Sequence, residues 1–190
     1  EFNDTGGTTA ADGLRIVIDP NTQIQVRRLN NSGQVYEPNS LPPSNNLDNG
    51  VYLRANGQLY GPSHFRLGAA ARLSYNTQTI SATTPANPAV PGVQQTATST
   101  LVVTNGPQVS IVWKYTTPLD FLVAEVTVVI PSGFAVSAAN PVRFSHAFDT
   151  FLGGSDLGCG VTFVDSNGKR VIGTYPPPLG VCTSTTTIPA

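Results

Sequence analysis

The chain has 190 residues, which suits one all-β domain of ordinary size or two small domains. Only 11% of its residues are charged, against roughly 25% in a typical soluble domain. With a formal net charge of −1 and no cluster of Lys and Arg, the sequence predicts no nucleic-acid partner. Its polar surface must consist mainly of Thr, Ser, Asn and Gln, which favours an extracellular location.

The start of the chain is polar. Residues 1–13 show no periodicity, which predicts an N-terminal tail, and Glu1-Phe2 is either a natural start or an expression remnant. The segment lacks the charged and apolar regions of a signal peptide, which indicates a mature chain or an excised fragment. No apolar run approaches the roughly 18 residues that cross a bilayer as a helix, so we expect a protein that is not inserted in a membrane.

The first strands are expected directly after this tail. Apolar residues alternate along 14–18 and again along 23–27, and Asp19-Pro20-Asn21 separates the two runs. This pattern predicts two strands joined by a turn. Residues 37–50 are rich in Pro, Asn and Ser and predict a surface loop.

Four Asn-Gly pairs are the strongest turn signals, because both residue types tolerate the positive φ of a two-residue hairpin turn. We expect turns at Asn49-Gly50, Asn56-Gly57, Asn105-Gly106 and Asn167-Gly168. The second pair lies between two short apolar runs and predicts a hairpin over 51–60.

Residues 77–98 are rich in Thr, Pro, Ala and Gln, with prolines at 85, 88 and 91. Proline is excluded from central strands, so the segment predicts a long exposed loop. A linker between two domains is the alternative, since long loops are uncommon inside a compact domain. We expect one domain over 14–182, with a possible boundary within 77–98, and a Thr-rich tail over 183–190.

The second half carries the longest strand patterns. Alternation over 109–116 predicts a half-buried strand, with Trp113 in the core. Both sides of 121–130 are apolar, which predicts a central strand covered on both faces. Further strands are expected over 142–149, 161–164 and 169–174. The fold class is therefore an all-β, antiparallel, two-sheet β-sandwich of about ten strands, with little or no helix.

The chain has two cysteines, Cys159 and Cys182, near its C-terminal end. An even count in polar, loop-rich surroundings predicts one disulfide, which would contribute about 3 kcal/mol in the chain-entropy model. Two buried free thiols are the alternative.

No catalytic constellation emerges. Ser145 and His146 are adjacent and Asp149 is near, but alternation places Ser145 and His146 on opposite faces of one strand. We expect His146 to pack among Val142, Phe144 and Phe148 with its ring nitrogens satisfied locally. Glycosidases need two carboxylates that flank the scissile bond, but glutamate is scarce and nothing marks a pair of aspartates, so the sequence predicts a protein that is not an enzyme.

A metal cofactor has little support. The two histidines belong to no spaced ligand pair, which argues against zinc. Calcium is the only metal with candidate ligands, Asp149 and Asp156, which flank a glycine-rich stretch. Ordinary turn chemistry explains the same residues.

A sugar site without catalysis would use exposed aromatic rings and neutral polar groups. Tyr36, Tyr52 and Tyr60, with Arg54 nearby, are the candidate ligand-binding residues. Part of any such set is ordinarily in the core.

In composition the chain resembles secreted or surface-displayed β modules of adhesins, appendages and viral fibres. The leading hypothesis is a non-enzymatic extracellular or cell-surface module with an adhesive or structural role. One alternative is a carbohydrate-binding module, and another is a self-assembling fibre or filament subunit. The expected partners are a glycan, a protein surface ligand, or copies of the chain itself.

Overall fold

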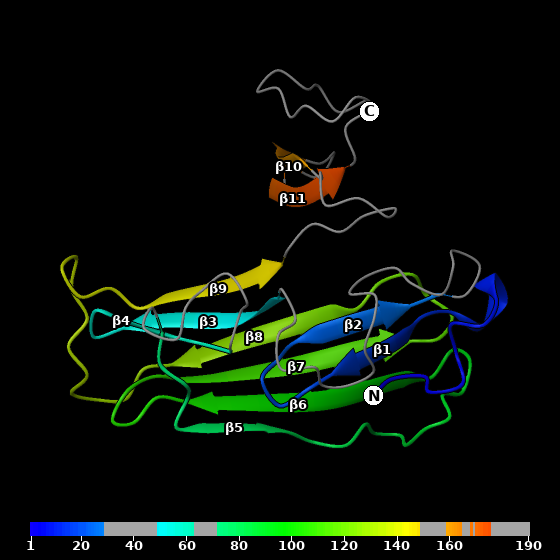
Figure 1. Ribbon diagram of the computed structural model, residues 1–190, viewed down its shortest axis with the longest axis horizontal. Coiled ribbons are helices and arrows are strands. Elements are labelled where there is room, and N and C mark those ends of the chain that lie inside the picture. Colours follow the sequence, from blue (N-terminus) through cyan, green and yellow to red (C-terminus); the bar gives the residue numbers. More distant parts are fainter. Residues whose placement is uncertain (29–48, 63–71, 149–158, 165–167, 169, 176–190) are drawn as a thin grey trace. The chain divides into compact units, whose positions relative to one another are not determined.

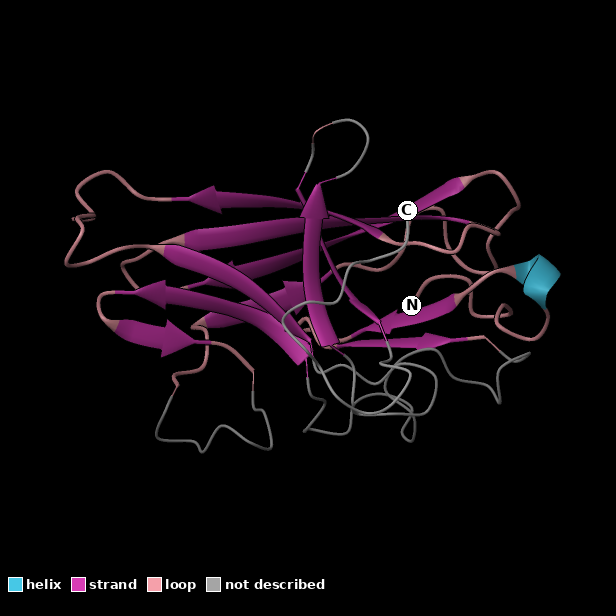
Figure 2. Ribbon diagram, turned by 90° about the horizontal axis from the view of Figure 1, so that it is seen from above, coloured by secondary structure: helices cyan, strands magenta, loops and turns pink. Residues whose placement is uncertain are grey.

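A computed structural model describes residues 1–28, 49–62, 72–148, 159–164, 168 and 170–175. These residues form eleven strands and one three-residue 3-10 helix, Ala10–Asp12, and all pairings between the strands are antiparallel (Figure 2). The chain divides into two compact units, Glu1–Phe148 and Asp149–Ala190. The prediction of an all-β, antiparallel protein is confirmed.

The largest sheet of the first unit has four strands in the order β5-β6-β7-β8, seen in green in Figure 1. They are β5 (Thr77–Ile80), β6 (Gln94–Val102), β7 (Gln108–Thr116) and β8 (Val123–Val129). β6 and β7 pair over nine residues, and Asn105 between them has a φ of 51°. A turn lies where it was predicted, but its central residues are Thr104 and Asn105 and not Asn105-Gly106, because Gly106 N donates to Val103 O at 3.0 Å.

Two smaller sheets complete the first unit. β1 (Arg15–Ile18) and β2 (Ile24–Arg27) form a hairpin, as predicted. The other sheet has the order β4-β3-β9, with β3 (Asn49–Ala55), β4 (Gln58–Tyr60) and β9 (Arg143–Phe148). Asn56 and Gly57 have φ values of 50° and 71° between β3 and β4, which confirms that hairpin turn.

The second unit contains the hairpin of β10 (Cys159–Val164) and β11 (Arg170–Tyr175). Gly168 has a φ of 77° between these strands, in agreement with the predicted turn at Asn167-Gly168. The disulfide remains a prediction, because Cys182 and the side chain of Cys159 lie outside the described residues.

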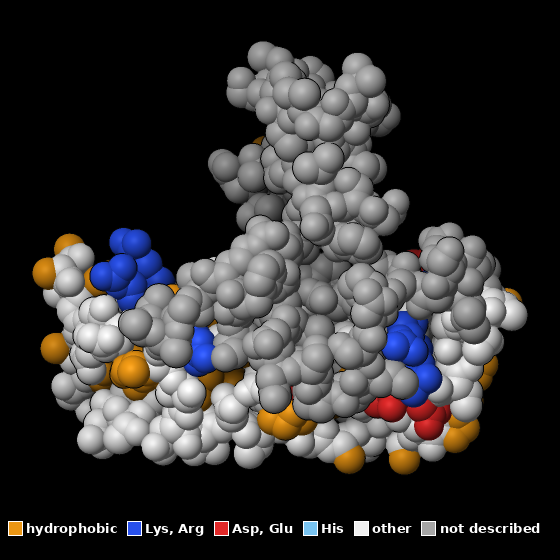
Figure 3. Space-filling view, in the orientation of Figure 1, with side chains coloured by type: hydrophobic (Ala, Val, Ile, Leu, Met, Phe, Trp, Pro, Cys, Tyr) orange, Lys and Arg blue, Asp and Glu red, His pale blue; other side chains and the backbone are white. Residues whose placement is uncertain are grey.

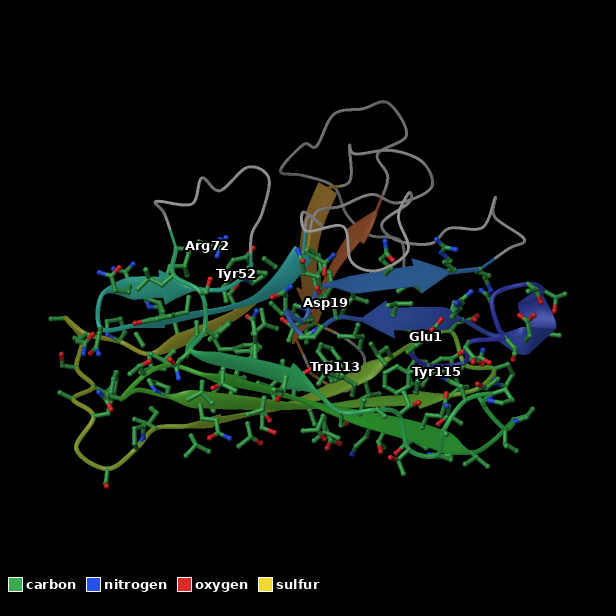
Figure 4. All side chains as sticks on the ribbon, turned by 60° about the horizontal axis from the view of Figure 1, so that its bottom comes forward. Glu1, Asp19, Tyr52, Arg72, Trp113 and Tyr115 are labelled. Carbon is green, nitrogen blue, oxygen red and sulfur yellow. The ribbon has the colours of Figure 1, made fainter. Side chains whose placement is uncertain are left out.

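One hydrophobic cluster forms the core of the first unit. It includes Ile16 of β1, Leu53 of β3, Leu101 of β6, and Ile111 and Trp113 of β7. Figure 4 shows Trp113 and Tyr115 on the side of the four-stranded sheet that faces β1 and β3. The predicted core position of Trp113 is confirmed, since this residue is 1% exposed and its Nε1 donates to Ser99 Oγ at 2.8 Å.

The predicted central strand over 121–130 is wrong. β8 pairs only with β7 among the described residues, and nearly all of its side chains are exposed. Apolar residues on both faces indicate burial on both faces, but that pattern does not distinguish a covered strand from an exposed edge.

The predicted loop over 77–98 is also too long. Strands β5 and β6 occupy its two ends, and the loop between them is only 81–93. Both strands are rich in Thr and Gln, so hydrophobicity did not identify them. The whole segment lies inside the first unit.

Asn49-Gly50 is not the predicted hairpin turn but the start of β3, where Asn49 pairs with Phe148 of β9. The Asn49 side chain is buried, and it accepts from Ile24 N at 2.6 Å and donates to Ile24 O at 3.1 Å. Gly50 is required by a close approach, because a Cβ there would lie 2.3 Å from Pro62 Cγ.

The N-terminal segment is not simply a polar tail. Phe2 is fully buried, its backbone pairs with Ile16, and its ring makes an edge contact with Tyr115 at a centroid distance of 6.5 Å. Asn3 is also buried and donates to Leu14 O at 2.9 Å. A single apolar residue carries no periodicity, so the pattern did not reveal this anchor.

Candidate functional site

The outer face of the four-stranded sheet is lined by hydroxyl groups. Alternation along β6 turns Gln95, Ala97, Ser99 and Leu101 inward and the intervening residues outward. Antiparallel register then places Thr79, Thr100, Ser110 and Thr127 in one row across all four strands. We call the outward hydroxyl residues of this sheet the threonine face: Thr77, Thr79, Thr96, Thr98, Thr100, Ser110, Thr116 and Thr127.

The threonine face carries little net charge. Its charged neighbours Lys114 and Glu125 lie on adjacent strands and form an ion pair. Thr and Ser directly opposite each other also stabilise neighbouring strands, so the same residues both hold the sheet and present hydroxyl groups. The face can donate and accept hydrogen bonds without attracting ions of either sign.

A polar hollow lies elsewhere on the first unit. Its volume is about 320 Å³, and its described lining consists of Asn21, Gln23, Gly61, Pro62, Arg72, Ser74 and Gln78. Arg72 Nη1 donates to Gly61 O at 3.0 Å. Amides and a hydroxyl dominate this lining, and none of the described lining residues is acidic. The chemistry suits a neutral, hydroxyl-rich ligand.

A short chain of hydrogen bonds orients the amides of the hollow. Asn21 Nδ2 donates to Asp19 Oδ2 at 3.0 Å, and Gln78 Nε2 donates to Asn21 Oδ1 at 2.5 Å. Asp19 Oδ1 also accepts from Gln23 N at 2.8 Å. Burial raises the pKa of the Asp19 carboxyl, while these hydrogen bonds oppose that rise. The β1–β2 turn therefore orients the side chains of Asn21 and Gln78, because both amides are held by these hydrogen bonds.

The predicted aromatic surface is not assembled as one platform. Tyr52 is 5% exposed, and its ring lies so close to Gly61 that a Cβ there would be 2.2 Å from Tyr52 Cδ1. Tyr60 pairs directly with Leu53, so it shares the opposite face of the sheet from Tyr52, and its ring stacks on Tyr75. Arg54 is exposed on the Tyr52 side, and Tyr36 lies outside the described residues.

Figure 4 shows Arg72 and Tyr52 near each other in the first unit. Tyr52 therefore supports the wall of the polar hollow through Gly61 and presents almost none of its ring to solvent. In the space-filling view of Figure 3, the described surface is largely uncharged, with a few Lys, Arg, Asp and Glu groups.

The remaining predicted residues give no catalytic or metal centre to describe. Asp149 and Asp156, the calcium candidates, lie outside the described residues. In the part of the chain that is described, no three His, Cys, Asp or Glu side chains gather as metal ligands do. That part also contains no helix with the length and apolar character needed to cross a bilayer.

His146 packs against Trp113 and Phe148, with ring centroids 5.9 and 4.1 Å apart. The expectation that both of its ring nitrogens are satisfied locally is wrong for Nε2, which is buried without a hydrogen-bond partner among the described residues. Ser145 pairs with Tyr52 and His146 pairs with Val51, so adjacent positions of β9 point to opposite faces. This arrangement agrees with the prediction that Ser145 and His146 do not work together.

No protein-family model, curated protein or solved structure matches the chain. The threonine face and the polar hollow are thus interpreted from their own chemistry.

Sequence reasoning missed both features. The alternation of Thr with Ala, Ser and Leu along 94–102 was a readable strand signal, but the neighbouring prolines masked it. No local sequence pattern predicted the polar hollow, because its described lining comes from four separate stretches of the chain.

Proposed function

We propose that this chain is a non-enzymatic module of an extracellular or surface-displayed protein, with an adhesive or structural role exerted through the threonine face. The observation that carries the proposal is the hydroxyl row that crosses all four strands of one sheet. A sheet fixes these groups at a regular spacing, so a partner meets them without ordering a loop. The partner is a glycan or a protein surface rich in neutral hydrogen-bonding groups.

The architecture proposed for this module is a two-sheet β-sandwich. The four-stranded sheet would form one layer, and the β1–β2 and β4-β3-β9 sheets would form the other. Support comes from the single buried cluster, which draws residues from β1, β3, β6 and β7. Support also comes from Tyr75, which lies just before β5 of the four-stranded sheet. Its hydroxyl donates to Val51 O of β3 at 3.1 Å and so links the two proposed layers.

An uncharged contact face has a measurable signature, because salt screens ionic contacts and leaves neutral hydrogen bonds largely unaffected. Beads coated with the protein should adhere to dextran, chitin or gelatin surfaces equally well in about 0.05 M and about 0.5 M salt. Thr98→Val with Thr100→Val keeps the branched shape and removes two hydroxyls. If each hydroxyl supplies about 1 kcal/mol, adhesion should weaken about 30-fold.

Thr104→Val is the matched control, since Thr104 is exposed in the turn between β6 and β7. It should leave adhesion unchanged. Adhesion that disappears at high salt, or that survives the double substitution, would contradict a role for the threonine face.

A second candidate function is carbohydrate binding, which the polar hollow favours. Labelled protein on a glycan array should bind a neutral glycan, and Gln78→Ala should remove that binding because Gln78 belongs to the oriented amide chain. Gln94→Ala is the control, since Gln94 is exposed at the start of β6. Equal loss in both variants, or no binding to neutral glycans by the unaltered chain, would exclude this candidate.

A further inference from the structure

β8 is an edge strand with an apolar inner face, and its outer face carries Val123 and Val129 at the two ends with the polar Glu125 and Thr127 between them. Val123 and Val129 on its outer face are 39% and 53% exposed, and Val126 on its inner face is 40% exposed. The inner neighbour of Val126 on β7 is Ile111, which is fully buried. The apolar inner face of the sheet therefore continues onto β8, where Val128 is partly buried against the core while Ala124 and Val126 are exposed. No described strand pairs with the outer edge of β8.

The other edges in the first unit are short, polar or charged, and the longest of them, β9, has six residues and carries Arg143. β5, the opposite edge of the same sheet, has four residues with the sequence TQTI, and β4 has three residues. Natural edge strands avoid association by being short or by carrying Lys or Pro. β8 has seven residues, contains no Lys, Arg or Pro, and has one charge, Glu125, which Lys114 pairs. It lacks the usual protection of an edge.

The pattern of apolar and polar residues in β8 is palindromic about its midpoint, Val126: it is the same when read in either direction. If two copies pair antiparallel about this midpoint, Val126 meets Val126, Ala124 meets Val128, and Val123 meets Val129. Glu125 of each copy then meets Thr127 of the other, whose hydroxyl can donate to the carboxylate. All seven residues are paired, and residues that face each other share one side of the sheet.

Neighbouring registers are worse for identifiable reasons. A shift of one residue toward the N-terminus centres the pair on Glu125 and sets two carboxylates opposite each other, which destabilises the pair. The opposite shift centres it on Thr127 and places Glu125 against Val129. Both shifts also leave residues at the strand ends unpaired. Charge and length therefore select the register centred on Val126.

We propose that a second copy of this chain docks on β8, antiparallel and centred on Val126, so that two four-stranded sheets join into one sheet of twice the size. The contact uses the same residues on both copies, so it closes into a two-fold dimer and does not propagate into a fibre. This proposal does not depend on what the threonine face or the polar hollow binds. Each can fail while the others stand.

Sedimentation velocity of the full chain over a range of concentrations tests the proposal. The species should change from the 19.9 kDa chain to a dimer as the concentration rises. Hydrogen exchange should slow in the amides of β8 over the same range and remain unchanged in those of β5. A chain that stays monomeric at millimolar concentration would overturn the proposal.

Two substitutions at one exposed position then test the register. Thr127→Glu sets two pairs of carboxylates against each other across the dimer axis and should raise the dissociation constant about 2-fold to 30-fold. Thr127→Lys places an ammonium opposite Glu125 of the second copy and should lower it. A nonspecific effect of charge at an edge would weaken the dimer in both variants.

Thr79→Glu is the control on the opposite edge, where Thr79 is exposed in the same row of the threonine face. It should leave the dissociation constant unchanged. Thermal unfolding of each variant checks that the fold is intact. Equal weakening by Thr127→Glu and Thr127→Lys would overturn the register, and dimerisation that neither change affects would overturn the use of β8.

Discussion

The ring of His146 lies against two aromatic rings and faces the buried side of β9. Burial lowers the pKa of this imidazole from 6.5 to about 4. The folded protein therefore holds His146 neutral, and an unfolded chain binds its proton more readily. Stability from this residue is complete above the unfolded pKa and is lost as the pH falls through the folded one.

This linkage predicts a pH effect that one substitution removes. Between pH 6.5 and about pH 4, the free energy of unfolding should fall by about 2 kcal/mol because of His146, allowing for its partial exposure. His146→Phe preserves an aromatic ring and cannot be protonated, so its unfolding free energy should decline less over that interval. Urea unfolding at several pH values measures the difference. Parallel decline in both proteins would contradict the assignment.

Tyr115 shows how one side chain can join distant segments. Its hydroxyl accepts from Leu14 N at 2.7 Å and donates to Leu119 O at 3.0 Å, while its ring contacts Phe2. The N-terminal segment is therefore held by both backbone pairing and a buried hydroxyl. No local sequence pattern predicts the hydrogen bond between Leu14 and Tyr115, because the two residues are about a hundred positions apart in the chain.

At the scale of the element, Asn49 joins strands that belong to different sheets. Its side-chain amide bonds both backbone groups of Ile24 in β2, while its backbone, which belongs to β3, pairs with Phe148 of β9. Thr22 adds a second link, since its hydroxyl accepts from Val51 N at 3.1 Å. These side chains supply the hydrogen bonds that the backbone of a neighbouring strand would otherwise make at that edge of β2.

Asn49→Ala should lower the free energy of unfolding by about 2–4 kcal/mol, because it removes two buried hydrogen bonds and leaves the Ile24 backbone groups unsatisfied. Asn56→Ala, at an exposed turn, should cost less, about 1 kcal/mol, because it removes a residue that tolerates positive φ and only one exposed hydrogen bond, which Asn140 Nδ2 donates to Asn56 Oδ1 at 3.2 Å. Chemical denaturation followed by Trp113 fluorescence compares them. If the Asn49 variant is as stable as the Asn56 variant, the result would contradict a bridging role for Asn49.

The strand patterns were predictable to the extent that one face is buried and apolar. β1, β2, β3 and β7 follow that rule, and their positions were recovered from alternation. β6 alternates Thr with small inward residues and was partly hidden, and β8 was assigned to the wrong place in the sheet. Alternation reports which residues can be buried, while strand order depends on pairings between distant segments.

At the scale of the whole molecule, the described buried cluster, from Phe2 to Tyr115 with further hydrophobic residues out to Phe144 packed against it, belongs to the first unit, while most side chains of the second unit lie outside the described residues. The second unit contributes a two-stranded hairpin, and an isolated hairpin of that size is only marginally stable in water. Cooperative unfolding should therefore be a property of the first unit.

A chain shortened to residues 1–150 tests this directly, because Trp113 is the only tryptophan and lies in the cluster. Its fluorescence transition in urea should remain single and cooperative, with an unfolding free energy within about 1 kcal/mol of the full chain. A second substitution, Leu53→Ala, should lower stability by about 2–5 kcal/mol in both the shortened and the full chain, since Leu53 is fully buried. A shortened chain without a cooperative transition would show that the core depends on residues beyond 150, and the division of the fold into two units would have to be abandoned.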